Sequence, residues 1–365
     1  MILQNEREGA KMVQKLLTYM EEHHLDAFYV SKPENVRYIS RYTGDDSYLL
    51  ITKEKKYFIT DPRYTEQASY ECPDYDIINW KDYGKSMGET LAALLSKTDC
   101  KNLAFEAEVV TYNKYRDIED RIKVELVPQV DVIETFRSVK SKDEIEKLRI
   151  SADIASRAFE KIIKDIRVGV TEKELASKLS HYMVMEGADT KPYGGILISG
   201  ARTSLLHGIP SSKAVEYGDL VLMDYGCQYK GYLSDMTRTV VVGKATPKQR
   251  EVYALEQQMV ADCEAVMKAG ATGAEVYEAS TRAIRGTEYF DYHYTGIGHG
   301  IGMFVHEIPF MAPASKAVFE PGNVITVEPG IYIPGWGGIR IEDEVLITEN
   351  GCENLISATK ELIEL

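Results

Sequence analysis

The feature that most constrains the fold is an acidic residue placed inside each of two consecutive apolar segments. Residues 220–242, LVLMDYGCQYKGYLSDMTRTVVV, are rich in β-branched and apolar side chains with a central glycine, which is typical of two strands joined by a turn. Asp224 and Asp235 interrupt these strands, where an unpaired buried carboxylate is costly. A hairpin centred between Tyr229 and Lys230 would place the two carboxylates opposite each other, where like charges destabilise a sheet. We therefore expect positive charge between them.

A second segment near the C-terminus repeats this arrangement. Residues 323–348, NVITVEPGIYIPGWGGIRIEDEVLIT, contain Glu328 and Glu342, each inside an apolar strand pattern. Their midpoint is Gly335, within the turn-like PGWGG. The second hairpin would again place two carboxylates opposite each other, and two such pairs in one chain are hard to attribute to chance.

Three histidines of the same region lie in connections marked by glycine or proline: His207 in LLHGIP, His299 in GIGHGIG and His306 in FVHEIP. Glycines around His299 let the backbone approach a bound ion or substrate closely. Four carboxylates and one imidazole suit two divalent cations held side by side, because four positive charges balance four negative ones. The residues alone predict a dinuclear metal hydrolase, with ordinary sheet carboxylates paired to lysine or arginine as the alternative.

This ligand set also indicates which metals to expect. Mostly oxygen ligands with one imidazole favour manganese, cobalt, iron or zinc over a thiolate-type site. Two ions roughly 3.5–4 Å apart can share a hydroxide, because they lower the pKa of bound water toward neutrality. The cysteines at positions 72, 100, 227, 263 and 352 are scattered and form no CxxC pair, so we expect reduced thiols and no zinc knuckle.

The length of 365 residues is natural for two domains. Residues 1–135 alternate helical and strand patterns, including a strand pair in SYLLITKEKKYFIT, and we expect an α/β domain without a catalytic cluster. Ser141 followed by Glu144 fits a capping box and marks a helix start near the join. Residues 139–365 alternate long helical patterns with strand pairs, which predicts an α+β domain with helices on a largely antiparallel sheet.

Charge and hydropathy exclude several classes of partner. The formal net charge is −14, from 43 basic and 57 acidic residues, which argues against nucleic acid and anionic membrane surfaces. No apolar run reaches the roughly 18 residues needed to span a bilayer, and the first residues, MILQNEREGAK, lack the apolar core of a signal peptide. We therefore expect a cytoplasmic protein without a nucleic-acid or membrane partner.

Four segments closely resemble the pita-bread metallopeptidases, a family that includes aminopeptidase P, prolidase and methionine aminopeptidase. They are MDYGCQYKGYLSDMTRT, GIGHGIGMFVHEIP, ITVEPGIYI and GIRIEDEVLIT. In the first domain, NVRYISRYTGDDSYLLIT and TDPRYTEQA resemble the amino-terminal domain of the aminopeptidase P and prolidase branch. The resemblance implies a creatinase-like α/β domain over residues 1–135 and a pita-bread catalytic domain over residues 139–365.

The resemblance also implies roles for particular residues. Two divalent metal ions, with manganese expected first and cobalt, zinc or iron as alternatives, would be held by five ligands: Asp224, Asp235, His299, Glu328 and Glu342. Three residues resemble the catalytic groups beside the scissile bond: His207, His306 and Glu328. His207, His306 and Arg340 are the expected substrate contacts, although Arg340 has the alternative role of supporting Glu342. Thr237 shares a strand face with Asp235 and is expected to hold its carboxylate in place.

One position departs from the pattern of the proline-specific members. These often have a further histidine four residues before the ligand histidine, where this chain has Thr295. The nearest histidine is His293. It either occupies the same space through an altered loop or is a loop histidine without a catalytic role.

The implied activity is hydrolysis of the bond between an N-terminal residue and proline in short peptides, as in an Xaa-Pro aminopeptidase. An Xaa-Pro dipeptidase, or prolidase, is the alternative of the same class. A creatinase-like C–N hydrolase and a non-catalytic pita-bread binding protein are disfavoured, because such relatives lack ligands that are all present here. The relatives further imply a homodimer, in which the first domain limits access to the site.

Overall fold

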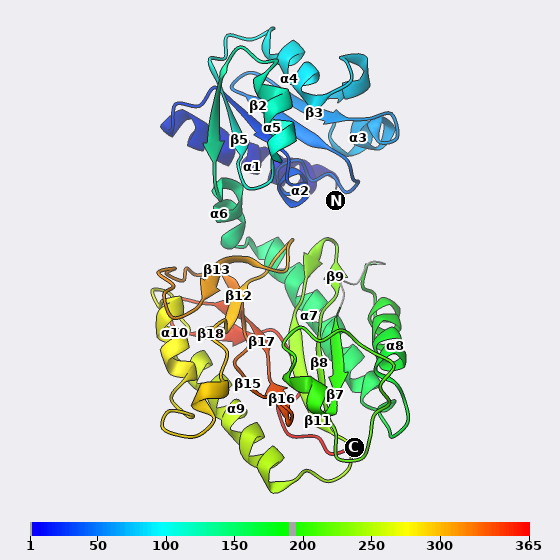
Figure 1. Ribbon diagram of the computed structural model, residues 1–365. Coiled ribbons are helices and arrows are strands. Elements are labelled where there is room, and N and C mark those ends of the chain that lie inside the picture. The colour runs from blue at the N-terminus through cyan, green and yellow to red at the C-terminus, as the bar shows by residue number, and fades with distance from the viewer. Residues whose placement is uncertain (1, 190–194) are drawn as a thin grey trace. The chain divides into compact units, whose positions relative to one another are not determined.

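The structure is a computed structural model that describes residues 2–189 and 195–365, and it divides into two compact units (Figure 1). The units are Met1–Arg137 and Ser138–Leu365. The predicted domains, residues 1–135 and 139–365, fall one within each unit. Among the described residues, no helix is both long and apolar enough to cross a membrane.

The first unit is an α/β domain built on a six-stranded mixed sheet in the order β4-β3-β2-β1-β5-β6. β2 pairs antiparallel with β1 and β3, whereas β1–β5, β5–β6 and β3–β4 are parallel. The strand pair predicted from SYLLITKEKKYFIT is confirmed as β2 and β3. The elements are α1 (Ile2–Glu22), β1 (Ala27–Val30), α2 (Pro33–Ser40), β2 (Tyr48–Thr52), β3 (Lys56–Thr60), α3 (Thr65–Glu71), β4 (Asp76–Asn79), α4 (Met87–Leu95), β5 (Asn102–Glu106), α5 (Tyr112–Glu119), β6 (Glu125–Gln129) and α6 (Val132–Ser138).

The second unit is α+β, as predicted, and consists of two parts of similar construction. Helices α7 (Lys142–Ile162) and α8 (Glu172–Met185) pack on each other and against strands of the first part, and α9 (Pro247–Val266) and α10 (Gly273–Ser280) do the same in the second. In Figure 1, α8 and the α9–α10 pair lie on opposite sides of the strands of this unit. Each helix begins with a capping box, whose hydroxyl residues are Ser141, Thr171, Thr246 and Thr272.

The strands of this unit form a three-stranded sheet β11-β8-β7, a five-stranded sheet β13-β12-β14-β17-β18, and the two-stranded ladders β9–β10 and β15–β16. Their bounds are β7 (Ile196–Ser199), β8 (Leu220–Tyr225), β9 (Gln228–Tyr229), β10 (Tyr232–Leu233), β11 (Met236–Val241), β12 (Gly298–Gly300), β13 (Glu307–Met311), β14 (Val324–Val327), β15 (Gly330–Ile333), β16 (Gly337–Arg340), β17 (Asp343–Ile347) and β18 (Cys352–Asn354).

The first acidic hairpin differs from its prediction in register. Asp224 on β8 pairs with Thr237 on β11, and the β9–β10 ladder closes a two-residue turn at Lys230 and Gly231. Both turn residues have positive φ, +49° and +86°, as a type I′ turn requires. The predicted turn centre and the direct pairing of Asp224 with Asp235 are therefore wrong. Asp235 instead lies diagonally across from Asp224, on the same face of the ladder.

The second acidic hairpin has the predicted register. The β14–β17 ladder pairs Val327 with Asp343, and the β15–β16 ladder continues the same register toward the turn. Gly335 lies at the turn with a φ of +79°, a conformation that glycine adopts without strain. Glu328 and Glu342 consequently lie opposite each other at the break between the two ladders.

Candidate metal centre

The five predicted ligands lie on strands of the second unit or directly beside strand ends, and the fold brings them together. Nε2 of His299, on β12, lies 3.3 Å from Oε1 of Glu328 and 3.9 Å from Oδ2 of Asp235. Asp235, His299 and Glu342 each offer a ligand atom within 4.8 Å of the others. The charge of Asp224 acts on Glu342, and the charge of Glu328 acts on Asp224. Side chains separated by more than a hundred positions thus form one acidic cluster.

Glu342 is the most deeply placed of these carboxylates. It is 1% exposed, and its Oε2 accepts a hydrogen bond of 2.7 Å from the Thr237 hydroxyl. Its Oε1 is buried and has no hydrogen-bond partner among the described residues. Burial, together with the charges of Asp235, Glu328 and Asp224, raises the pKa of Glu342 well above its usual value. An orphaned buried oxygen within an acidic cluster fits a bound cation.

Thr237 was expected to hold Asp235, but its hydroxyl binds Glu342 instead. The two residues are also joined through the backbone, because the N–H of Glu342 donates to the carbonyl oxygen of Thr237 at 3.1 Å. Thr237 therefore supports the deepest ligand from both its side chain and its main chain.

Arg340 supplies the positive charge expected near the first acidic hairpin. It is 3% exposed, and its guanidinium donates to Asp224, to the Thr237 hydroxyl at 3.0 Å and to the Tyr332 hydroxyl at 2.7 Å. Burial raises the pKa of Asp224, and the charge of Arg340 opposes that shift. Because every guanidinium nitrogen has a protein partner, the geometry favours the supporting role for Arg340 over substrate contact. The carboxylate that it holds directly is Asp224, not Glu342.

The His299 ring is oriented by the carbonyl oxygen of the next residue, Gly300. Its Nδ1 lies 3.1 Å from the carbonyl oxygen of Gly300, which fixes Nδ1 as the protonated nitrogen and turns Nε2 toward the carboxylates. Burial lowers the pKa of His299, but the hydrogen bond and charge of Glu328 outweigh burial and raise the pKa to about 9. The imidazole therefore interacts strongly with the acidic groups around it.

Arg238 holds the backbone on which Glu342 lies. Its buried guanidinium donates to the carbonyl oxygen of Glu342 at 2.6 Å and to Oδ1 of the neighbouring Asp343 at 2.7 Å. The same guanidinium donates to the carbonyl oxygens of Ala358 at 2.7 Å and Thr359 at 2.9 Å. Arg238 thereby ties the segment after β18 to the strand that carries a candidate ligand.

The two remaining histidines lie beside the cluster with exposed side chains. The His306 ring is 4.4 Å from the His299 ring, centroid to centroid, with an interplanar angle of 83°. Burial of part of the ring lowers the pKa of His306, and the charge of His299 adds to that effect. The charge of His207 acts on both Asp224 and His306, so the structure brings both predicted histidines to the cluster.

Glu172, which the sequence did not single out, holds both ends of the loop that carries His207. Its Oε1 accepts from the N–H of Ser199 at 2.8 Å, and its Oε2 accepts from the N–H of Ser211 at 2.9 Å. Arg202 lies 3.2 Å from the same carboxylate. Burial opposes ionisation, but the hydrogen bonds outweigh it and lower the pKa of Glu172. An acidic residue in a first helical turn is common for helix-dipole reasons, so no sequence signal distinguished this one.

The His293 ring has structural partners on both of its nitrogens. One ring nitrogen lies 3.0 Å from the Ser280 hydroxyl, and the other lies 3.2 Å from the carbonyl oxygen of Gly330. The ring stacks on Tyr277, and burial lowers the pKa of His293. Thr295 is exposed. The structure therefore favours a structural role for His293.

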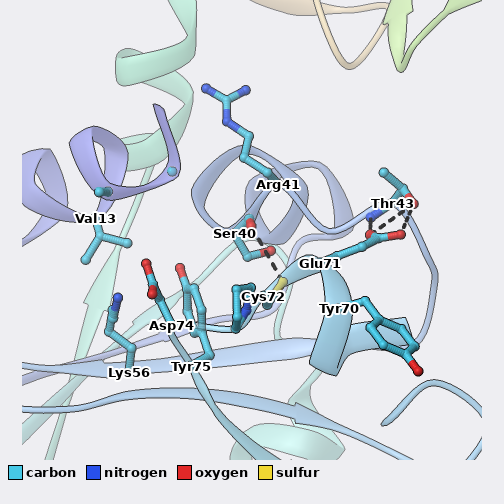
Figure 2. A pocket seen from close by; sticks show the side chains of 13 residues that line it. Val13, Ser40, Arg41, Thr43, Lys56, Tyr70, Glu71, Cys72, Asp74 and Tyr75 are labelled. Atoms are coloured by element: carbon cyan, nitrogen blue, oxygen red, sulfur yellow. Dashed lines mark hydrogen bonds between the residues drawn. The ribbon is translucent and has the colours of Figure 1, made fainter. Parts of the chain in front are cut away.

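A separate cavity of about 320 Å³ lies within the first unit (Figure 2). Cys72 is a nucleophilic residue at its wall, but burial raises the pKa of the Cys72 thiol to about 12. A thiol with that pKa is protonated at neutral pH and is a poor nucleophile. Glu71, also at the wall, accepts hydrogen bonds from the N–H and hydroxyl of Thr43 at 2.7 and 2.8 Å. We therefore place the candidate catalytic chemistry in the second unit.

Comparisons with known proteins agree with this placement. Residues 146–349 match the family model of "Metallopeptidase family M24", and residues 12–139 match that of the "Creatinase/Prolidase N-terminal domain". The chain is 34% identical to an Xaa-Pro dipeptidase of Pyrococcus furiosus, over 96% of this chain and 99% of the relative. A solved Xaa-Pro dipeptidase from Bacillus anthracis superposes with a TM-score of 0.93 at 37% identity, covering 98% of this chain and 100% of the other. A solved X-Pro aminopeptidase from Thermotoga maritima superposes with a TM-score of 0.86 at 34% identity, covering 94% of this chain and 98% of the other.

The support of the His207 loop by Glu172 can be tested by changing Glu172 to Gln, which keeps the size of the side chain but removes its charge and one acceptor oxygen. We expect the free energy of unfolding of metal-free protein to fall by about 1–3 kcal/mol at neutral pH, measured by urea unfolding. Because folding lowers the pKa of Glu172, its contribution is present above the unfolded pKa and is lost as pH falls through the folded pKa. The difference between wild type and variant should therefore shrink below about pH 4.

The matched control is Glu160→Gln, which changes an exposed glutamate of α7. It should alter the free energy of unfolding little at either pH. Equal stability of the Glu172→Gln variant and wild type at neutral pH would contradict the role given to Glu172.

Proposed function

The chain belongs to metallopeptidase family M24, and from that membership we propose that it is an Xaa-Pro exopeptidase, which hydrolyses the bond between an N-terminal residue and a proline in second position. The observation that carries the proposal is the gathering of Asp235, His299 and Glu342 within 4.8 Å, with Glu328 beside them. The names of similar proteins add the substrate class, because the dipeptidases and the aminopeptidase described above all act before proline by name.

We assign the metal-binding role to the residues that resemble the family's ligands: Asp224, Asp235, His299, Glu328 and Glu342. Four carboxylates and one imidazole suit two divalent ions of borderline hardness, manganese first and cobalt, zinc or iron as alternatives. The orphaned Oε1 of Glu342 supports this fit. Such ions, when bound, polarise a carbonyl group and lower the pKa of a water molecule.

Three residues around the ions would have separate roles in hydrolysis. Glu328 would take up and return a proton near the scissile bond. Its Oε1 accepts a hydrogen bond of 3.3 Å from the Thr326 hydroxyl, and its charge acts on His306. His306 would donate a hydrogen bond to the oxyanion that develops on the carbonyl oxygen. His207 would orient the peptide from the opposite loop. Proline suits a site of this kind because its tertiary amide has no N–H to satisfy.

Substrate length is the point on which the named relatives differ. A dipeptidase must recognise the free carboxylate next to proline, through a cationic group such as an arginine. Arg340 is committed to Asp224, Thr237 and Tyr332, so we do not assign it that contact. We propose that Xaa-Pro dipeptides are substrates, as the dipeptidase relatives suggest, with longer Xaa-Pro peptides as the alternative.

We further propose that the protein acts as a homodimer in the cytoplasm. The proposal of a reducing compartment is supported by the five cysteines, none of which forms a disulfide in the structure. The dimer proposal follows from the resemblance alone, and light scattering of the purified protein tests it.

Asp235→Asn tests the metal assignment, because it removes one charge with little change of shape. We expect loss of most of the activity and a lower metal content after dialysis, measured by elemental analysis. The control Asp291→Asn changes an exposed carboxylate and should retain both. Full activity of wild type without bound metal would overturn the assignment.

His306→Ala tests the oxyanion role. We expect kcat to fall by about 10²–10³-fold, because loss of one such donor costs that much in other hydrolases. Metal content should not change. The control His181→Ala removes an exposed histidine of α8 and should leave kcat unaltered. An unchanged rate constant in the His306 variant would remove this role.

Three peptides test the substrate class: Ala-Pro, Ala-Pro-Ala and Ala-Ala-Ala, each incubated with metal-loaded enzyme and followed by mass spectrometry. We expect Ala-Pro to be cleaved and Ala-Ala-Ala to be the poorest substrate. Cleavage of Ala-Pro-Ala at a comparable rate would favour the aminopeptidase alternative. Faster cleavage of Ala-Ala-Ala than of either proline peptide would contradict proline specificity.

A further inference from the structure

Lys140 and Glu307 form a buried ion pair that has no role in the proposed function. Nζ of Lys140 lies 3.2 Å from Oε2 of Glu307, and the two side chains are 1% and 4% exposed. A buried pair adds little stability over a well-packed apolar pair, but loss of one partner leaves an uncompensated charge. Such a pair therefore has more value in fixing geometry than in stabilising the fold. What it fixes follows from the position of each partner.

Glu307 directly follows His306, and its carboxylate folds back over the loop between β12 and β13. Its Oε1 accepts from the N–H of Phe304 at 3.0 Å, so the carboxylate is bonded to the chain just before His306. A Cβ atom at Gly302 would lie 2.7 Å from Oε2 of Glu307, so the carboxylate has room only because position 302 is glycine. The loop is thus closed around His306 by the side chain of the next residue.

Lys140 is itself fixed to the start of another strand. Its N–H donates to the carbonyl oxygen of Gly322 at 2.9 Å, and the preceding Val139 forms a bridge with Asn323. Asn323 precedes β14, and β14 leads directly to Glu328. Lys140 therefore connects the loop that carries His306 to the strand that carries Glu328.

The His306 ring depends on this support. Its side chain is exposed, whereas the ring must stay 4.4 Å from the His299 ring to face the same reacting centre. An exposed ring is held mainly by the backbone that carries it, and a displacement of about 1 Å in a catalytic group can cost 10²-fold in rate. We propose that the Lys140–Glu307 ion pair positions His306 relative to Glu328, which makes Lys140 a positioning residue for hydrolysis. This inference rests on the proposed role of His306.

A double-mutant cycle on kcat tests the proposal. Lys140→Met should lower kcat by about 10–10²-fold, with KM for Ala-Pro and the metal content unchanged. In a His306→Ala background the same change should cost nothing further, because its effect passes through the missing ring. In a His207→Ala background the two losses should multiply. The control Lys142→Met, which changes an exposed lysine two residues away, should have no effect.

A charge-matched variant separates positioning from folding. Lys140→Met alone removes the ammonium group that lies 3.2 Å from the buried Glu307 carboxylate and should lower Tm. Lys140→Met combined with Glu307→Gln removes both charges and should recover most of Tm, while kcat stays low because the bridge between loop and strand is absent. Recovery of kcat together with Tm would overturn the proposal, and so would a multiplicative loss in the His306→Ala background.

A crystal structure of the Lys140→Met variant decides the matter independently of activity. We expect the His306 ring to leave its position beside His299 while the five candidate ligands stay in place. A ring that remains in its wild-type position would refute the positioning role. If the wild type failed to cleave Xaa-Pro peptides, the proposed function would fall, and this crystallographic result would still decide the role of Lys140.

Discussion

The repulsion among four gathered carboxylates is the constraint on which the second unit depends. Burial raises the pKa of Asp224 and Glu342, and the neighbouring acidic groups add to the shift at Glu342. The fold opposes this cost with donors on the inner side: Arg340 binds Asp224, and Thr237 binds Glu342. It leaves one buried oxygen of Glu342 that suits a cation. A bound cation would therefore stabilise the cluster, whereas the same carboxylates without a cation would repel one another.

The cluster lies where the two similar parts of the unit meet. Each part consists of two capped helices and one acidic hairpin, and the bridge between Thr237 and Glu342 joins the hairpins. Neither hairpin alone provides more than two of the carboxylates. The loops of His207 and His306 both lie beside this junction, and each is held by a buried glutamate, Glu172 or Glu307.

Local patterns predicted much of this arrangement. The capping box at Ser141, the second hairpin and the gathering of Asp235, His299 and Glu342 follow from residues close in sequence or from the family resemblance. The register predicted for the first hairpin was wrong because the turn lies at Lys230 and Gly231, where a non-glycine residue adopts positive φ. The Lys140–Glu307 pair spans 167 positions, and no periodicity encodes such a contact. The contact between Arg340 and Asp224 likewise spans 116 positions and could not be predicted from the sequence pattern.

Arg238 has a consequence for the order in which this protein matures. The backbone of Glu342 is held by a guanidinium that also requires the carbonyl oxygens of Ala358 and Thr359. During synthesis the first unit can fold as soon as it leaves the ribosome, because domains fold from the N-terminus onward. The acidic cluster cannot reach its final form until residues 358–359 have emerged. Uptake of metal therefore follows the emergence of this segment, long after the strands that carry Asp224 and Asp235 have been made.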